Sequence, residues 1–430
     1  MLQGRILRLA QALLIAIPSF TLYGYIQVGV GSLTSFENFT RVFPDLDTVH
    51  APSAAAESRN SLIEGVYVAS CTLGAAVGSL YCFLVGDVLS RRVSIFLGAL
   101  LTFIGGLLSS TAFQLPQLFI GRILSGTGIG IIATSVPVWQ SECSRAVNRG
   151  QHVVVDGISV SAGYMISNWV NYGLWHIQEH QAGWRVSQAI PSAIAIAPIV
   201  SIFFLSESPR WLLRVGRKTE AARELSLIRG YDIDSAEIKE ELASIEFSLA
   251  ETKQSTASVK DIFTMKDGKY FFRFMLIIGV QFWMQLSGTS VITTYATTIF
   301  KQDLQLSGGL SRILASCVLT SKFIASFFPF FTIDRLGRRT SFLIAGVGTT
   351  IGMLALGVTV RYASTSYGAA IGSVFFSFFY SILFPIGFLG PTYLYTTEVV
   401  PTRLRMTMTS ISTFQHWLWY TALWPRYSYT

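Results

Sequence analysis

Charged residues are scarce in this chain. They make up 13% of its 430 residues, which is about half of the roughly 25% found in an average soluble domain. Hydrophobic residues make up 51%, and the mean hydropathy is +0.49. The length would allow two or three soluble domains, but so few charges would leave them with too little solubilising surface. The composition therefore indicates a protein whose main solvent is lipid.

Cysteine and histidine are also few, which argues against a metal centre or a catalytic cluster. The cysteines lack metal-ligand spacing and lie in or just past apolar runs, as small buried side chains do. They are Cys71, Cys82, Cys143 and Cys317. The histidines are scattered, mostly in predicted loops. They are His50, His152, His176, His180 and His416. We therefore expect no enzymatic activity and no metal or other cofactor.

Long apolar runs recur along the whole chain. The first, from about Leu9 to Val30, is long enough to span a bilayer and has no small-residue cleavage site close behind it. A helix needs roughly 20 mostly apolar residues to cross about 30 Å of hydrocarbon. Eleven stretches qualify, centred near residues 20, 73, 103, 128, 164, 196, 284, 320, 351, 382 and 416. Each must be helical because lipid offers no partner to backbone polar groups, so the sequence predicts an all-α membrane protein.

Several of these spans contain glycine, which is common where membrane helices pack closely. In the fourth span, Gly126, Gly128 and Gly130 recur at every second position. We interpret them as points where neighbouring helices approach, with no other role.

Basic residues are unevenly shared between the two sides of the predicted membrane. If the N-terminus is cytoplasmic, most of the Lys and Arg residues fall inside, including a dense group from Arg210 to Arg273. The predicted external segments hold Arg41, Arg59, Arg185, Lys301, Arg312 and Arg361. This bias follows the positive-inside rule and predicts a cytoplasmic N-terminus. It also explains the net charge of +8 without a nucleic-acid partner.

The longest polar segment, from about Glu207 to Lys269, separates six spans from the five that follow. Apolar residues such as Leu225 and Ile228 recur within it at helical spacing, which predicts short amphipathic helices. We therefore expect a six-helix bundle over residues 1–206, a cytoplasmic linker over 207–269, and a second, incomplete bundle over 270–430.

The two halves share charged signals at corresponding places. An Asp is followed by two Arg residues after span two and again after span eight, and a Glu is followed seven residues later by an Arg after span four and span ten. The residues are Asp87, Arg91, Arg92, Glu142 and Arg149 in the first half, and Asp334, Arg338, Arg339, Glu398 and Arg405 in the second. The repetition implies a duplicated six-span unit with two pseudo-symmetric bundles.

These carboxylates and arginines are expected to form bidentate pairs between helices on the cytoplasmic side. Such pairs would hold a gate closed and break when the two halves rock. An alternative is that Arg91 and Arg92 merely follow the positive-inside rule, but that would leave the acidic partners unexplained.

With these residues in place, the chain resembles the sugar porter family of the major facilitator superfamily over about residues 10 to 420, and its fungal members most closely. The resemblance rests on Gly121-Arg122, Pro137-Val138-Trp139-Gln140-Ser141-Glu142, Gly183-Trp184-Arg185, Glu207-Ser208-Pro209-Arg210-Trp211-Leu212, Gln285-Leu286-Ser287-Gly288 and Gly390-Pro391. It implies a twelve-helix fold, alternating access, a monosaccharide-sized central site and a monomer in the plasma membrane. It also adds Arg122, Glu207 and Arg210 to the expected cytoplasmic salt-bridge network.

The resemblance further implies a set of sugar-binding residues, mostly in span seven. They are Gln281, Gln285, Ser290 and Tyr295, with Tyr393 where the family usually has Trp. Gln281 and Gln285 are four residues apart, so both amides face one side of a helix and match hydroxyls that donate and accept. The alternative is that these polar groups bond to a neighbouring helix.

Some positions depart from the family pattern. Met284, Ser290, Thr294 and Gly157 stand where hexose carriers usually have hydrogen-bonding or aromatic groups. A less hydroxylated or bulkier ligand is therefore possible.

Other positions bear on energetics. Ile26 stands where proton-coupled relatives carry Asp, which predicts a passive uniporter unless Asp156 substitutes. Lys322 is predicted near mid-membrane, where a charge is costly, and is shared by fungal relatives that include quinate carriers. It either holds a substrate carboxylate or structures the cavity through helix carbonyls. Arg122 is expected to pair with Glu142 or Asp87.

The resemblance implies a twelfth helix, whereas this chain stops at Thr430. We expect Pro425 to end the eleventh span early, and we interpret the chain as a C-terminally truncated form that transports poorly or not at all.

The leading interpretation is a carrier that moves a monosaccharide or polyol by facilitated diffusion, with the sugar and the lipid bilayer as its only partners. Alternatives are a quinate or other organic-acid carrier that uses Lys322, a proton-coupled sugar symporter and, more remotely, a non-transporting sugar sensor.

Overall fold

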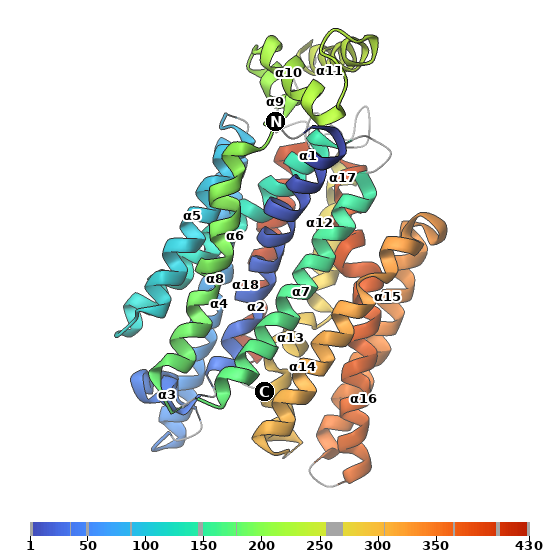
Figure 1. The fold of residues 1–430 in the computed structure, drawn as a ribbon. Coiled ribbons are helices and arrows are strands. Elements are labelled where there is room, and N and C mark those ends of the chain that lie inside the picture. The colour runs from blue at the N-terminus through green and yellow to red at the C-terminus, as the bar shows by residue number, and fades with distance from the viewer. Residues whose placement is uncertain are drawn as a thin grey trace.

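The structure is a computed structural model that describes residues 3–34, 36–48, 51–86, 88–144, 149–177, 179–254, 270–304, 306–363, 366–400 and 405–427. Helices are the only regular elements in these described ranges. Figure 1 shows a bundle of long helices with further helices lying across one end, which we call the linker end.

The first half runs from α1 to η4. Its elements are α1 (Gly4–Gln11), η1 (Ala12–Ala16), α2 (Ile17–Leu33), α3 (Glu37–Val42), η2 (Pro44–Leu46), α4 (Ala54–Val85), α5 (Arg91–Ser110), α6 (Leu115–Cys143), α7 (Arg149–Trp175), α8 (Gln181–Ser201) and η4 (Ile202–Phe204). The helices of the linker end follow. They are α9 (Pro209–Arg214), α10 (Lys218–Arg229) and α11 (Ala236–Gln254).

The second half runs from α12 to α18. Its elements are α12 (Tyr270–Leu286), α13 (Thr289–Thr298), η6 (Ile299–Asp303), α14 (Gly308–Ala325), α15 (Phe328–Ala363), α16 (Tyr367–Phe384), η7 (Pro385–Leu389), α17 (Gly390–Val399) and α18 (Arg405–Tyr427). Helix α15 is interrupted by a sharp turn at Gly337, whose φ of 76° and ψ of 160° are not helical. This glycine adopts a positive φ at little cost and turns the chain from span eight into span nine.

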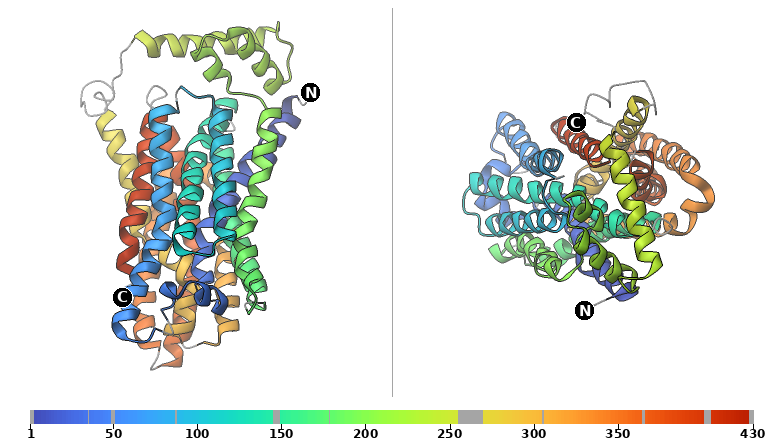
Figure 2. Two further views of the ribbon diagram at one scale, coloured as in Figure 1. Left: turned by 90° about the vertical axis from the view of Figure 1, so that its left-hand side faces the viewer. Right: turned by 90° about the horizontal axis from the view of Figure 1, so that it is seen from above.

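The helical membrane fold predicted from the apolar runs is confirmed. Each of the eleven predicted centres lies within a helix. Among the described residues, eight helices are long and apolar enough to cross a membrane, and the apolar α12 is shorter. The views in Figure 2 show the long helices running along one another, with α9 to α11 lying over their ends.

The glycines of α6 lie where neighbouring helices come closest. A Cβ at Gly126 would collide with the backbone oxygen of Cys71 in α4, and one at Gly128 would collide with that of Gly98 in α5. Both separations would be far shorter than van der Waals contact, so only glycine fits. The expectation that these residues permit close packing is therefore confirmed, and α6 is held between α4 and α5.

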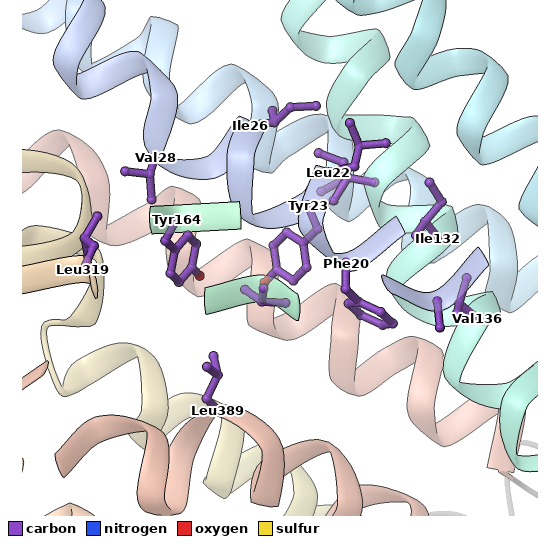
Figure 3. Close-up of a cluster of buried hydrophobic side chains, with 14 of the residues drawn as sticks. Phe20, Leu22, Tyr23, Ile26, Val28, Ile132, Val136, Tyr164, Leu319 and Leu389 are labelled. Atoms are coloured by element: carbon purple, nitrogen blue, oxygen red, sulfur yellow. The ribbon is translucent and has the colours of Figure 1, made fainter. Parts of the chain in front are cut away.

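The two halves also pack against each other around a shared interior. Tyr23 of α2 lies edge-on to Trp417 of α18 at a centroid separation of 5.3 Å. The hydroxyls of Thr72 in α4 and Thr421 in α18 are 2.8 Å apart. Figure 3 shows Tyr23 and Tyr164 of the first half in one cluster with Leu319 and Leu389 of the second.

The predicted early end of the eleventh span at Pro425 is wrong. Helix α18 continues through this residue to Tyr427, a length of 23 residues. Proline removes only one backbone donor, and a membrane helix tolerates this where neighbouring groups adjust to satisfy the freed carbonyl.

The close packing at α6 can be tested with Gly126→Ala. The added methyl group would collide with α4, and overpacking of this kind costs about 1–3 kcal/mol. We expect a lower thermal unfolding midpoint in detergent and a smaller yield of monodisperse protein.

The matched control is Gly279→Ala in α12, where a Cβ would meet no atom within 4 Å among the described residues. It should leave the midpoint unchanged. A Gly126→Ala protein as stable as this control would contradict the packing described here.

Candidate functional site

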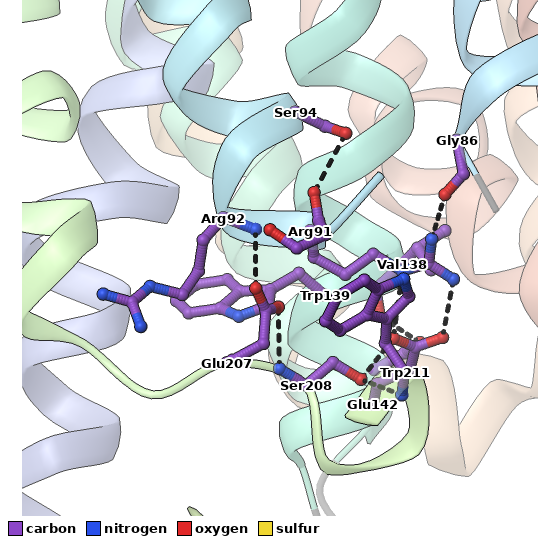
Figure 4. A network of polar contacts seen from close by, with 12 residues as sticks. Gly86, Arg91, Arg92, Ser94, Val138, Trp139, Glu142, Glu207, Ser208 and Trp211 are labelled. Atoms are coloured by element: carbon purple, nitrogen blue, oxygen red, sulfur yellow. Dashed lines mark hydrogen bonds and ion pairs between the residues drawn. The ribbon is translucent and has the colours of Figure 1, made fainter. Parts of the chain in front are cut away.

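An arginine and a glutamate are paired where α5 and α6 meet the linker end (Figure 4). The Arg91 Nε lies 3.2 Å from Oε2 of Glu142, and its Nη2 lies 3.4 Å from Oε1. Arg91 also donates to the backbone oxygen of Gly86. The Ser208 hydroxyl donates to Glu142 at 2.6 Å and, as the N-cap of α9, accepts from the backbone N–H of Trp211. The pair thus joins α5, α6 and the start of α9.

Glu207 and Arg92 make a second connection beside it. Glu207 accepts from the backbone N–H of Arg92 at 3.3 Å and from that of Ser208 at 2.9 Å. Burial raises the pKa of the Glu207 carboxyl, and these two hydrogen bonds oppose the rise. The Arg92 side chain donates to the backbone oxygens of Ile202, at 3.0 Å, and Phe203. It therefore ties α5 to the end of α8 and does not pair with a carboxylate in the described contacts.

The second half contains the matching pair. Arg338 and Glu398 form two parallel hydrogen bonds of 3.0 Å and 2.7 Å. Arg91 and Arg338 occupy equivalent places in the internal repeat, as do their two glutamates. The pairs differ in burial, because the first has side chains that are 4% and 9% exposed and the second 28% and 41%.

Other members of the predicted network are placed differently or lie outside the description. Arg210 donates to the Ser248 hydroxyl at 3.3 Å, which joins α9 to α11. Arg339 is exposed. Nothing is described of the side chains of Asp87, Arg149, Asp334 and Arg405.

Arg229, which no motif indicated, is a further anchor of the linker helices. Its guanidinium is 2.5 Å from Glu241 of α11 and donates to the backbone oxygen of Cys143 at 3.0 Å. It therefore connects α10 and α11 to the end of α6. Its place at the end of α10 was visible from the sequence, but its partner on α6 was not.

The expected pairing of Arg122 with Glu142 is wrong, and Arg122 is not part of the salt-bridge network at the linker end. The two residues are twenty positions apart on one continuous helix, which corresponds to about 30 Å. Arg122 is 3% exposed, donates to the backbone oxygen of Ile26 at 3.3 Å and lies 5.5 Å from the centroid of the Tyr67 ring. Its charge is held by a helix carbonyl and an aromatic face.

Gln281 and Gln285 both face His416 of α18. The Gln281 Oε1 lies 2.9 Å from His416 Nδ1, and the Gln285 Nε2 lies 3.0 Å from His416 Nε2. The two amides are 2% exposed. An imidazole protonated on Nδ1 alone would donate to Gln281 Oε1 and accept from Gln285 Nε2, so the neutral ring bonds to both amides. The Oε1 of Gln285 has no hydrogen-bond partner among the described residues.

These glutamines therefore bond to a neighbouring helix in this structure, which was the alternative interpretation of the sequence. His416 was missed because it was treated as one scattered histidine. A polar ring near the middle of an apolar run was the available signal, since such residues mark functional or cavity-facing positions in membrane helices.

A small central cavity lies beside this cluster. It includes Tyr23, Gln27, Tyr164, Gln285, Thr289, Tyr393, His416 and Tyr420 in its lining, with residues from both halves. Its volume of about 10 Å³ holds roughly one water molecule. The halves are thus closed around a polar interior that has no room for a ligand in this arrangement.

Some of the predicted binding residues line this cavity and others are buried close to it. Gln285 and Tyr393 line it directly, whereas Gln281 and Ser290 are buried nearby. Gln27 and Tyr164 were not predicted to line it, and the Tyr164 hydroxyl donates to Gln27 at 2.7 Å. The side chain of Tyr295 lies outside the described residues.

Lys322 lies behind the cavity wall and is 1% exposed. Its ammonium donates to the Thr289 hydroxyl at 3.1 Å and lies 5.0 Å and 4.4 Å from the ring centroids of Tyr164 and Phe384. Its described contacts include no carboxylate. The structure therefore surrounds a buried cation with one hydroxyl and two aromatic faces.

Removing Arg91 should destabilise the protein more than removing Arg338. Arg91→Ala leaves a buried carboxylate without its cation, which costs about 3–5 kcal/mol. Arg338→Ala breaks a partly exposed pair, which typically contributes about 0–1 kcal/mol. The thermal unfolding midpoints of the two variants in the same detergent measure this difference, and equal shifts would show that burial does not separate the pairs.

The chain matches the family described as "Sugar (and other) transporter" over residues 11–423. The major facilitator superfamily transporter mfsA of Aspergillus fumigatus is 30% identical, with 97% of this chain and 77% of that protein covered. The sugar transporter STL1 of Saccharomyces cerevisiae is 28% identical, with 94% of this chain and 70% of that protein covered.

The solved structure of XylE from E. coli, described as a proton:xylose symporter, has the same fold. It superposes with a TM-score of 0.82 at 21% identity and covers 97% of this chain and 87% of its own. The fold, the repeated arginine–glutamate pairs and the family match over nearly the whole chain lead to one assignment: the protein belongs to the sugar porter family of the major facilitator superfamily.

Proposed function

We propose that this protein carries a monosaccharide or polyol across a membrane by alternating access. The observation that carries the proposal is the closed polar cavity between two halves, with a matching arginine–glutamate pair at the linker end of each half. A substrate enters when the halves part on one side and leaves when they part on the other.

Gln281 and Gln285 hold the substrate in this proposal, and His416 occupies their amides when no substrate is present. A sugar hydroxyl both donates and accepts, so neighbouring hydroxyls can replace the imidazole on Gln281 Oε1 and Gln285 Nε2. Tyr393 supplies an aromatic face in the cavity wall, and Ser290 and Tyr295 complete the proposed binding set.

Transport is proposed to be passive. Ile26 is buried and cannot carry a proton. Asp156 is buried in α7 and does not line the central cavity. A cytoplasmic N-terminus remains our proposal for orientation, supported by the basic residues of the linker and its neighbouring loops. The plasma membrane remains our proposal for location, and it rests on the family resemblance alone.

Uptake measurements test the substrate class and the coupling together. We expect a transporter-deficient yeast that expresses this chain to take up a labelled sugar or polyol slowly and without accumulating it. Uptake should be unchanged by a protonophore and by a shift of one external pH unit. Accumulation that a protonophore abolishes would reject passive transport.

The role of the glutamines is tested with Gln285→Ala. This variant loses a buried hydrogen bond to substrate, so KM should rise about tenfold, as expected for the loss of about 1.4 kcal/mol. Gln114→Ala, at the exposed start of α6, is the matched control and should transport normally. A normal KM in the Gln285 variant would remove this residue from the binding site.

A second candidate is a carrier of polyhydroxylated acids. It is favoured by Lys322, whose described contacts are the Thr289 hydroxyl and two aromatic rings, with no carboxylate beside it. A substrate carboxylate near Thr289 would supply the missing negative charge.

Lys322→Met separates the two candidates, because it keeps much of the side-chain volume and removes the charge. If the substrate is an acid such as quinate, its uptake should fall at least tenfold while any sugar uptake persists. Equal effects on quinate and neutral sugars would assign Lys322 a purely structural role.

A further inference from the structure

A second and larger cavity lies at the linker end of the first half. It is bordered by residues 88–90, Arg92, Val93, Phe203 and Glu207 on one side, and by residues of α9 and α10 on the other. Its volume is about 490 Å³, within the range of roughly 300–1,000 Å³ typical of small-molecule sites. The central cavity lies within the bundle and shares no lining residue with it.

The charged side chains of this wall are mostly engaged with one another or with the backbone. Arg92 donates to the backbone oxygens of Ile202 and Phe203. Arg217 forms an ion pair with Glu220 at 2.5 Å, and Glu207 accepts two backbone hydrogen bonds. The arginines are therefore already matched, which argues against a site for a phosphate or another anion.

Two buried polar atoms in the same wall have no hydrogen-bond partner among the described residues. One is the Nε1–H donor of Trp211 in α9, and the other is the Oε2 acceptor of Glu224 in α10. A buried donor or acceptor without a partner costs about 1–3 kcal/mol. A ligand that satisfies both atoms would recover this free energy.

The two atoms need opposite partners. An ammonium group can donate to Glu224 but cannot accept from Trp211, and a carboxylate or phosphate can accept from Trp211 but not donate to Glu224. A hydroxyl group does both. The indole of Trp211 and the phenyl ring of Phe203, whose residue is 52% exposed, add apolar surface for the C–H face of a polyol or sugar ring.

We propose that this linker-end cavity binds a polyhydroxylated small molecule, a free sugar or polyol, through Trp211 Nε1–H and Glu224 Oε2. The site is separate from the transport path, and this proposal does not depend on whether the central cavity carries sugar. With the orientation proposed above, it opens towards the cytoplasm and would sense the sugar or polyol on that side.

The site is tested on the purified full chain in detergent by saturation-transfer difference NMR, which detects weak binding. The probes are D-glucose and D-sorbitol, with ethanolamine and acetate as the cationic and anionic comparators. The background is Gln281→Ala with Gln285→Ala, which weakens the central site. Trp211→Phe removes the N–H donor and keeps an aromatic ring, and Glu224→Gln removes the charge and replaces one acceptor oxygen with an NH2 donor.

We expect D-glucose or D-sorbitol to saturate a site in this background, and each of the two substitutions to weaken its affinity about tenfold. Trp283→Phe and Glu237→Gln, both at exposed positions, should leave it unchanged. Unchanged unfolding midpoints establish that the variants are folded.

An affinity for D-glucose or D-sorbitol that neither substitution changes would overturn the proposal. Saturable binding of ethanolamine or acetate alone would overturn it too. Absence of any binding in the glutamine background would overturn it as well. Failure of the transport proposal looks different, because uptake would then be absent while binding that depends on Trp211 persisted.

Discussion

Lipid cannot satisfy a buried polar group, and this constraint governs the interior of the protein. Every donor or acceptor taken out of water must find a partner within the bundle. Gln281 Oε1 and Gln285 Nε2 find their partner in His416, and Lys322 finds its partners in Thr289 and two aromatic rings. The Oε1 of Gln285 is left without a partner among the described residues. Most of the groups that we propose to bind substrate are thus paired within the bundle when the two halves are closed.

Each half contains an arginine–glutamate pair at the linker end, but the two pairs differ in how deeply they are buried. Arg91 and Glu142 are buried, and Glu142 accepts a hydrogen bond from Ser208 at the start of α9. Arg338 and Glu398 form a bidentate pair that is partly exposed. A buried pair is costly to break, and an exposed pair is not. The first half, together with α9 to α11, therefore forms the more rigid part of the linker end, and the second half is the part more easily released.

The sequence predicted the features that depend on local pattern. Long apolar runs placed the spans, and the spacing within α6 placed its glycine contacts. The repeated Arg and Glu residues indicated the pairs Arg91–Glu142 and Arg338–Glu398. The sequence-based predictions were wrong where a residue's partner lies far away in the sequence, or where the length of a helix keeps two residues apart. His416 joins residues more than 130 positions away, and Arg122 lies too far along α6 to reach Glu142. The prediction that the eleventh span ends at Pro425 was also wrong, because the loss of one backbone N–H donor does not end a packed helix.

The account depends on the two halves separating around the central cavity. Thr72 in α4 and Thr421 in α18 join the halves through hydroxyls 2.8 Å apart, so cysteines at both positions can form a disulfide with little movement of the chain. We expect oxidation of the Thr72→Cys/Thr421→Cys protein to stop uptake, reduction to restore it, and the two single variants to transport under both conditions. Normal uptake with the disulfide formed would contradict the separation of the halves and with it the alternating-access account.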